Sequence, residues 1–190
     1  MLRGFEVRFH GRGGQGVVTA ARLLVEAAFI EGKWGQSIPM FGAERRGAPV
    51  LAFARISSSP IRRHSQIYEP DAVVVLDSKI LSLVDVTSGL KPNGLILINS
   101  RKSPSEFHFD SFRVGVVDAT GIAVDLGLYF AGFPAVNTAM VGALSRVSDI
   151  VSINSIVQAI RHDFSGTLAE KNARAASLAY DSVSFLEGGL

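Results

Sequence analysis

The residues best suited to bind a ligand lie near the start of the 190-residue chain, in a glycine-rich turn. Gly11, Gly13 and Gly16 have the spacing G-x-G-x-x-G. Between a strand and a helix, the first such glycine permits a sharp turn, the second lets a ligand approach the backbone, and the third lets the helix pack closely on the strand. Free N–H groups and the helix dipole attract an anion to this end of a helix. The candidate cofactor-binding residues of the turn are Gly11, Arg12, Gly13, Gly14, Gln15 and Gly16.

The same spacing has a purely structural interpretation, because many α/β proteins turn from the first strand into the first helix on glycines for packing alone. The pattern supports both interpretations about equally. An NAD site usually has an acidic residue about 20 positions further on, at the end of a second strand. Glu31 is the nearest candidate, but it precedes Gly32, where the first helix is expected to end. The sequence therefore disfavours simple NAD binding.

A second group of polar residues contains two adjacent arginines. Arg45 and Arg46 follow Glu44 in a segment rich in glycine and proline, and Arg62 and Arg63 are nearby in the sequence. Adjacent guanidinium groups can hold phosphate or carboxylate bidentately, so Arg45 and Arg46 are candidate cofactor-binding residues. The alternative is a solvated loop in which Glu44 neutralises a neighbour, and the residues alone narrowly favour it.

Other catalytic signatures are missing from the sequence. The four histidines share no metal-ligand spacing, no serine lies in a G-x-S-x-G motif, and no paired carboxylates suggest acid–base catalysis. The chain has no cysteine, which excludes disulfides, zinc–thiolate sites and iron–sulfur ligation. No catalytic or metal-binding residue is therefore assigned.

Two regular elements are expected to position the glycine turn. Residues 5–10 place apolar side chains on one face with a period of two, as in a strand. Residues 17–30 place apolar side chains on one side at helical spacing. The apolar runs 72–76, 95–99 and 112–117 are typical of strands buried on both faces of a parallel sheet.

These later strands end in polar residues, namely Asp77, Asn99 and Asp118. Open α/β sheets bind ligands beyond the carboxyl ends of their strands, so these residues should share one rim with the glycine turn. Taken singly, each is better explained as a cap for the next helix or turn.

The remaining segments complete the expected fold. Glycine and proline in residues 33–49 indicate an ordered loop, residues 49–56 a strand, and residues 61–68 either a short hairpin partner or a loop. Thr120 is expected to cap a helix reaching Phe130. Three more helices are expected from residue 135, over 154–164 and over 168–185. The fold class is α/β: residues 1–190 form a single Rossmann-like three-layer domain with a mostly parallel sheet and a β-hairpin or loop insertion after the first helix.

Composition limits the remaining possibilities. A net charge of +2 is poor evidence for a nucleic-acid partner, which requires a concentrated basic face. No apolar run reaches membrane-spanning length without a charge or glycine, and the N-terminus lacks the pattern of a signal peptide. We therefore expect a cytoplasmic protein with neither a nucleic-acid nor a membrane partner.

Three motifs in the same order resemble the gamma subunit of 2-oxoacid:ferredoxin oxidoreductases. Residues 11–20 read Gly-Arg-Gly-Gly-Gln-Gly-Val-Val-Thr-Ala, residues 41–50 read Phe-Gly-Ala-Glu-Arg-Arg-Gly-Ala-Pro-Val, and residues 68–71 read Tyr-Glu-Pro-Asp. The pyruvate and 2-oxoisovalerate enzymes look most similar. The indolepyruvate and 2-oxoglutarate enzymes share the Gly-Gly-Gln-Gly core but are less similar in residues 41–50.

The resemblance implies a role within a larger enzyme. The family's complexes oxidise a 2-oxoacid with coenzyme A to acyl-CoA and carbon dioxide, and pass two electrons to ferredoxin. Thiamine diphosphate with Mg²⁺ lies on the alpha and beta subunits, and [4Fe-4S] clusters lie on beta and delta. This chain is therefore expected to carry no cofactor, to be inactive alone, and to assemble with the alpha, beta and delta subunits, reaching ferredoxin through the complex.

The family's matching domain lies over the thiamine site and is implicated in coenzyme A binding. The resemblance thus implies that the Gly13–Gly16 turn, Arg45 and Arg46 bind coenzyme A phosphates or close the thiamine cavity against water. One alternative is a stand-alone Rossmann-type oxidoreductase that binds NAD or FAD. Another is an assembly module with an empty Rossmann-like site.

Overall fold

The computed structural model describes residues 4–40, 48–63, 65–109 and 111–187. Seven strands form one sheet in the order β2-β3-β1-β4-β5-β6-β9. Their bounds are β1 Phe5–Arg12, β2 Trp34–Pro39, β3 Pro49–Ser57, β4 Ala72–Val75, β5 Leu95–Asn99, β6 Arg113–Val117 and β9 Ser184–Leu186. Strands β1, β4, β5 and β6 are parallel, and β2 runs in the same direction because it is antiparallel to β3, which is itself antiparallel to β1. Five of the seven strands therefore point one way, which confirms the mostly parallel sheet.

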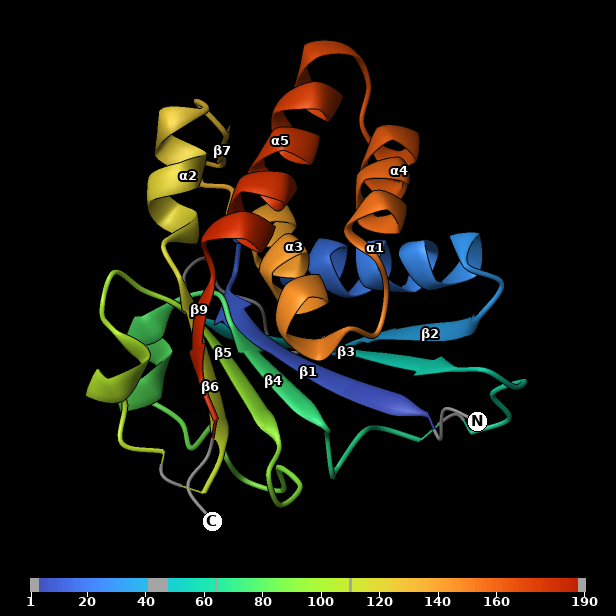
Figure 1. The fold of residues 1–190 in the computed structure, drawn as a ribbon, viewed down its shortest axis with the longest axis vertical. Coiled ribbons are helices and arrows are strands. Elements are labelled where there is room, and N and C mark those ends of the chain that lie inside the picture. Colours follow the sequence, from blue (N-terminus) through green and yellow to red (C-terminus); the bar gives the residue numbers. More distant parts are fainter. Residues whose placement is uncertain (1–3, 41–47, 64, 110, 188–190) are drawn as a thin grey trace.

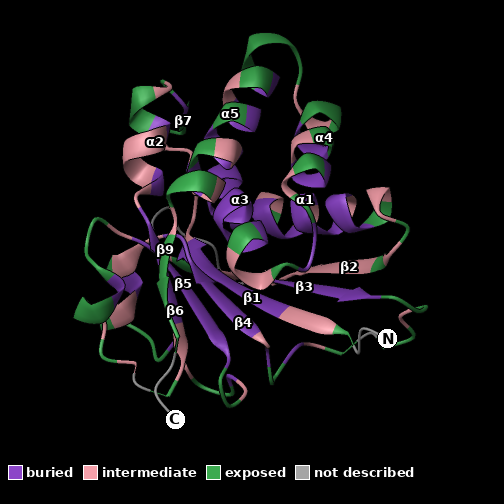
Figure 2. Ribbon diagram, in the orientation of Figure 1, coloured by how far each residue is buried: buried purple, intermediate pink, exposed green. Residues whose placement is uncertain are grey.

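The α-helices of the described residues gather on one face of this sheet (Figure 1). They are α1 Val17–Ile30, α2 Ala119–Asp125, α3 Asn137–Ser148, α4 Ile153–Asp163 and α5 Gly166–Ser182. Strand residues such as Phe9, Val74 and Leu97 pack against the helices in the larger core. Figure 2 shows the resulting buried band along the strands and the inner sides of the helices.

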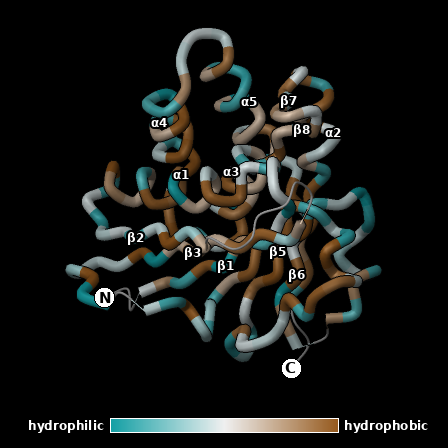
Figure 3. The backbone as a smooth tube through the Cα atoms, turned by 180° about the vertical axis from the view of Figure 1, so that it is seen from behind, coloured by the Kyte–Doolittle hydropathy of each residue, from teal (hydrophilic) through white to brown (hydrophobic). Residues whose placement is uncertain are grey.

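A smaller apolar core covers the other face of β4, β5 and β6. There Val73, Ile96 and Val114 pack against Ile80 and partly buried aromatic side chains. Short 3-10 helices, η1 Ser78–Ser82 and η2 Pro104–Glu106, and the adjoining loops supply this layer. The hydrophobic strands between the two layers are visible from behind in Figure 3. The α/β class with both faces of the central strands covered is thus confirmed.

The insertion after α1 is a β-hairpin rather than a strand preceded only by a loop. The expectation of a loop over residues 33–49 was wrong for Trp34–Pro39, which pairs with β3 along its whole length. A Cβ on Gly35 would come within 2.7 Å of the Val25 side chain, so this glycine lets the strand approach α1. The glycine and proline that suggested a loop are tolerated because β2 is an edge strand.

Two boundaries in the second half also differ from expectation. Helix α2 ends at Asp125, and its cap is Asp118 rather than Thr120, because the Asp118 carboxylate accepts a hydrogen bond from the Gly121 N–H at 2.8 Å. The chain beyond it forms a small hairpin of β7 Tyr129–Phe130 and β8 Phe133–Pro134. Helix α5 ends at Ser182, and the residues expected to extend it form β9 beside β6.

The two options left open for residues 61–68 are resolved in favour of the loop, since the described residues of this segment form no strand.

Candidate functional site

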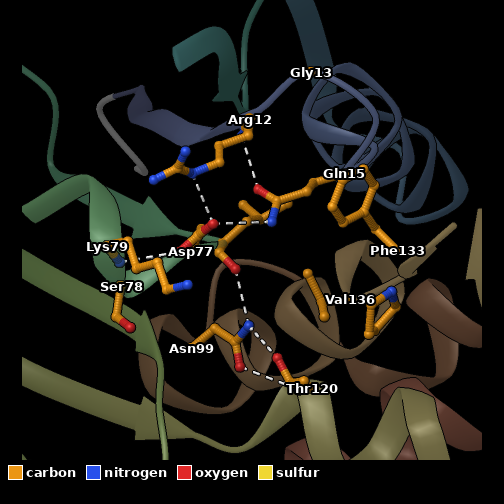
Figure 4. Close-up of a pocket in the computed structure, with 12 residues that line it drawn as sticks. Arg12, Gly13, Gln15, Asp77, Ser78, Lys79, Asn99, Thr120, Phe133 and Val136 are labelled. Carbon is orange, nitrogen blue, oxygen red and sulfur yellow. Dashed lines mark hydrogen bonds and ion pairs between the residues drawn. The ribbon is translucent and has the colours of Figure 1, made fainter. Parts of the chain in front are cut away.

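A cavity of about 450 Å³ lies at the carboxyl ends of β1, β4 and β5, and we call it the crevice. From β1 the chain passes through α1 to β2 and β3 on one side of the sheet, and then returns to β4 on the other side. The crevice therefore lies at the point where strand order reverses, which is where open α/β sheets bind ligands. Its lining residues include Arg12, Gly13, Gln15, Asp77, Lys79, Asn99, Thr120 and Phe133 (Figure 4).

The glycines of the turn have different structural roles from those that the spacing predicted. Gly11 is still in β1, and a Cβ there would come within 2.4 Å of Val17 Cγ2, so Gly11 is the residue that allows close helix–strand packing. Gly16 has φ +74° as the N-cap of α1 and packs against Asn137 of α3. Gly14 has φ +96°, and its Cβ position is unobstructed. The first and third glycines thus serve packing, although a left-handed backbone at Gly14 and Gly16 also shapes the helix start.

Several N–H groups of the turn are already paired within the protein. The Gln15 side-chain oxygen accepts from the Arg12 N–H at 2.7 Å. The Gly13 N–H donates to the Ala48 carbonyl and the Gln15 N–H to the Arg12 carbonyl, each at 3.0 Å. The backbone N–H groups of Arg12, Gly13 and Gln15 are therefore not available to a ligand. The donors suited to an anion are those at the start of α1, which has no side-chain cap.

Asp77 ties this turn to the end of β4. One carboxylate oxygen lies 2.9 Å from Arg12 Nε and 3.3 Å from Gln15 Nε2, and the other accepts from the Lys79 N–H at 3.0 Å. The predicted role of Asp77 as a cap is confirmed, since it is the N-cap of η1. The same carboxylate also fixes the side chains of Arg12 and Gln15 at the crevice, as Figure 4 shows.

The far wall of the crevice is also held by hydrogen bonds. The Asn99 side chain is buried; it donates to the Leu76 carbonyl at 2.8 Å and to Thr120 Oγ1 at 2.9 Å, and accepts from the Thr120 N–H at 3.1 Å. These contacts join β4, β5 and the start of α2. The expectation that polar strand ends share a rim with the glycine turn is thus confirmed for Asp77 and Asn99.

Positive charge is present at both ends of the opening. Lys79 is exposed, and its ammonium group has no hydrogen bond or ion pair with the described residues. A shallow hollow of about 190 Å³ lies at the first turn of α1 and shares Arg12 and Gly13 with the crevice. Lys79 in the crevice and the start of α1 in the hollow are therefore two neighbouring positions that attract an anion.

Behind the turn, β1 buries two basic side chains on the face opposite α1. Arg8 Nη2 donates to the carbonyls of Val86 at 2.8 Å and Ser88 at 2.7 Å, and its Nε donates to His10 Nε2 at 3.0 Å. Burial, together with the nearby Arg8 charge, lowers the pKa of His10 to about 4. Burial also lowers the pKa of Arg8, against the attraction of Asp85. His10 is therefore neutral at physiological pH, and its Nε2 can accept the hydrogen bond from Arg8 within β1.

The residues that the sequence analysis singled out as possible ligand contacts do not all line the crevice. Arg12, Gly13 and Gln15 line the crevice, and Gly14 and Gly16 line adjoining hollows. Arg45 and Arg46 lie outside the described residues. Arg62 and Arg63 lie at the opposite end of the sheet, beside the start of β1. Lys79 and Phe133 were not predicted as site residues, although Lys79 follows a polar strand end and could have been found from that position.

Glu31 does not occupy the position of a ribose-binding acid. It is the C-cap of α1, and its carboxylate accepts from the Ser152 N–H at 2.6 Å and from Lys33 Nζ at 2.7 Å. It therefore joins α1 to α4 and does not line the crevice. This geometry agrees with the sequence argument against simple NAD binding.

The described ranges contain neither a cluster of metal-binding side chains nor a helix suited to span a membrane. No group of three or more histidine, aspartate or glutamate side chains there could hold a metal ion. None of the helices described is both long and apolar enough to cross a bilayer.

Fold and site together define a Rossmann-like α/β domain with a crevice at its topological switch point. Residues 6–182 match the family model described as pyruvate ferredoxin/flavodoxin oxidoreductase. The chain is 53% identical over 186 residues to the pyruvate/ketoisovalerate oxidoreductases common subunit gamma of Pyrococcus furiosus, covering 96% of this chain and 98% of that protein. It is 50% identical over 178 residues to the pyruvate synthase subunit PorC of Methanothermobacter thermautotrophicus, covering 94% and 95%.

Solved structures agree with these matches. The crystal structure of the pyruvate oxidoreductase subunit PORC from Thermotoga maritima is similar with a TM-score of 0.82 and 36% identity, covering 98% of this chain and all of that one. A 2-oxoglutarate:ferredoxin oxidoreductase from Magnetococcus marinus, solved with 2-oxoglutarate, coenzyme A and succinyl-CoA bound, shares the fold at 16% identity and a TM-score of 0.76. That match covers 95% of this chain and 31% of the larger one. The chain belongs to the pyruvate ferredoxin/flavodoxin oxidoreductase family, as a gamma subunit of an oxidoreductase complex.

Proposed function

We propose that this gamma subunit helps to bind coenzyme A and to close the active site of a thiamine-dependent complex that oxidises pyruvate or a related 2-oxoacid. The complex forms acyl-CoA and carbon dioxide and reduces ferredoxin. The alpha, beta and delta subunits are the partners. Relatives at about half identity over nearly full length, named as a common subunit gamma and a subunit PorC, support a place in such a complex.

The residues of this chain do not fit an iron–sulfur cluster, because the sequence has no cysteine to supply a thiolate. We therefore place the clusters, with thiamine diphosphate and Mg²⁺, on the partner subunits. The bound thiamine supplies the chemistry that removes carbon dioxide from the 2-oxoacid. What this chain contributes is binding and exclusion of water.

The observation that carries the proposal is the crevice with its neighbouring hollow. Coenzyme A is an elongated polyanion, and the two spaces, which share Arg12 and Gly13, are lined by Lys79, the Arg12 side chain and the start of α1. Charge-assisted hydrogen bonds from such groups suit phosphate oxygens. Asp77 and Gln15 bind each other and Arg12, so their role is to hold the turn in place.

The apolar wall of the crevice suits closure against a partner subunit. Leu76, Phe133 and Val136 line it, and Phe133 is 39% exposed in the isolated chain. Leu76 and Val136 are already buried within this chain, so Phe133 is the side chain of this wall that a partner can cover. Burying it would remove water from the space beside the thiamine and would protect the reactive intermediate from side reactions.

The test is the KM for coenzyme A of the assembled complex carrying Lys79→Ala. We expect the KM for coenzyme A to rise about tenfold or more, because a charge-assisted contact contributes roughly 1.5–3 kcal/mol. The KM for the 2-oxoacid should stay unchanged, and Lys79→Arg should retain most of the affinity. Arg45→Ala and Arg46→Ala should act in the same direction.

The matched control is Arg174→Ala, which removes an exposed positive charge from α5, away from the crevice. An unchanged KM for coenzyme A in the Lys79, Arg45 and Arg46 variants would contradict the proposal. The stand-alone NAD or FAD oxidoreductase is not favoured, since Glu31 is used to join two helices.

A further inference from the structure

A second polar cavity lies at the opposite end of the sheet from the crevice, and we call it the basal cavity. Its volume is about 270 Å³. Glu6 at the start of β1 and Arg55 near the end of β3 face each other there, at directly paired positions. The loop after β3 brings Arg62 and Arg63 to the same cavity, and Lys91 completes it.

Positive charge exceeds negative charge in the basal cavity. Arg55 Nε lies 2.6 Å from Glu6 Oε1, and Lys91 Nζ lies 2.7 Å from a carboxylate oxygen of Asp71, so both acids are already paired. The side chains of Arg62 and Arg63 are exposed and have no hydrogen bond or ion pair within the described part of the chain. Four cations thus face two carboxylates, which leaves an excess of two positive charges.

The excess charge is held in place by Arg55, whose side chain is only 6% exposed. Its Nη1 donates to Gln36 Oε1 at 2.8 Å and to the Arg63 carbonyl at 3.2 Å, and its Nη2 donates to the Ser65 carbonyl at 3.2 Å. The buried guanidinium therefore fixes the backbone of the loop that carries Arg62 and Arg63. Adjacent like charges repel each other, so a loop fixed in this way gains most from a bound anion.

We propose that the basal cavity is a binding site for a phosphate dianion, either inorganic phosphate or the phosphate group of a monoester. Arg62 and Arg63 both line the cavity, and guanidinium groups match the charge and the bidentate geometry of a phosphate. Ser57 lies in the same lining, where its hydroxyl binds Ser59. The cavity is smaller than the roughly 300 Å³ at which pockets for whole small molecules begin, so it holds a phosphate group rather than a complete coenzyme. The site is separate from the crevice and does not depend on coenzyme A.

The test is thermal unfolding of the full chain in inorganic phosphate, compared with sodium chloride at equal ionic strength. Phosphate should raise the melting temperature by about 3–6 °C at ten times its Kd. Arg174→Ala, which removes an exposed arginine elsewhere, should keep this increase. The double variant Arg62→Ala/Arg63→Ala should lose it, and Arg62→Lys/Arg63→Lys should restore part of it.

Two results would overturn the proposal. One is a wild-type melting temperature that is the same in phosphate and in chloride. The other is a phosphate-induced increase in melting temperature that survives in Arg62→Ala/Arg63→Ala. If that variant also loses partner subunits during co-purification in high salt, the basal cavity is instead a docking site for acidic side chains of a partner subunit. Unchanged coenzyme A kinetics in this variant would leave the proposed role of the crevice intact.

Discussion

Replacing Gly16 by alanine should destabilise the chain more than the same change at another glycine with the same backbone conformation. Gly16 has φ +74° and Gly32 has φ +71°, so an alanine at either position bears the same left-handed strain. The new Cβ at position 32 has no heavy atom within 4 Å, whereas the one at position 16 would be 2.7 Å from Asn137 Nδ2 and 3.0 Å from Asn137 Cγ. The two variants therefore differ only in the contact with Asn137.

The expected loss of stability is the sum of the left-handed backbone strain and the steric contact with Asn137. Left-handed backbone costs a non-glycine residue about 1–2 kcal/mol, and overpacking a buried site costs about 1–3 kcal/mol more. Gly32→Ala should therefore lose about 1–2 kcal/mol, and Gly16→Ala about 2–5 kcal/mol. For a chain of this size each kcal/mol lowers the melting temperature by roughly 2–4 °C.

Urea unfolding followed by far-UV circular dichroism measures both variants against wild type. The m-value should stay constant while the midpoint falls further for Gly16→Ala. Adding Asn137→Ala to Gly16→Ala removes the two nearest atoms, so the double variant should show a favourable coupling of about 1 kcal/mol or more. Equal losses at positions 16 and 32 would refute the assignment of Gly16 to close packing against α3.

Two further predictions concern other parts of the chain. Gly142→Ala in α3 should lower the urea midpoint by the equivalent of about 2 kcal/mol or more, because the new Cβ would lie 2.1 Å from the Ala176 carbonyl oxygen of α5. This loss is expected even though alanine is the better helix former. A more stable variant would contradict the close α3–α5 packing. His10, whose pKa falls from 6.5 to about 4 on folding, contributes stability that is complete above pH 6.5 and is lost as the pH falls towards 4. Wild type should therefore lose about 2 kcal/mol more than His10→Asn between pH 7.5 and pH 5 in urea titrations, and parallel pH profiles would contradict burial of a neutral His10.

Much of the fold was predictable because its strongest signals are local. The strands β4, β5 and β6 are continuous apolar runs, and the helix after the glycine turn has a clear apolar side. Their common direction also placed Asp77 and Asn99 on one rim, and the crevice confirms this.

The parts that were missed depend on tertiary contacts that the local sequence does not show. Strand β2 is an edge strand whose Gly35 is explained only by the nearness of Val25. A positive φ angle at Gly127 follows the early end of the expected helix, and positive φ angles at Ala131 and Gly132 form the turn of the hairpin after α2.

The candidate site was only partly predictable for the same reason. Lys79 and Phe133 come from segments far from the glycine turn in the sequence, and only the fold brings them to the crevice. Arg62 and Arg63 show the reverse case: the loop after β3 places them at the end of the sheet opposite the crevice, which their sequence did not indicate. The glycine spacing located the turn but could not show that Gln15 and Arg12 are bound to Asp77.

The measurement that tests the central claim most directly is a structure of the assembled oxidoreductase complex with coenzyme A bound. The proposal predicts that coenzyme A phosphate oxygens lie within hydrogen-bonding distance of Lys79 Nζ or of the N–H groups at the start of α1. Coenzyme A held entirely by the partner subunits, with the crevice empty, would contradict it.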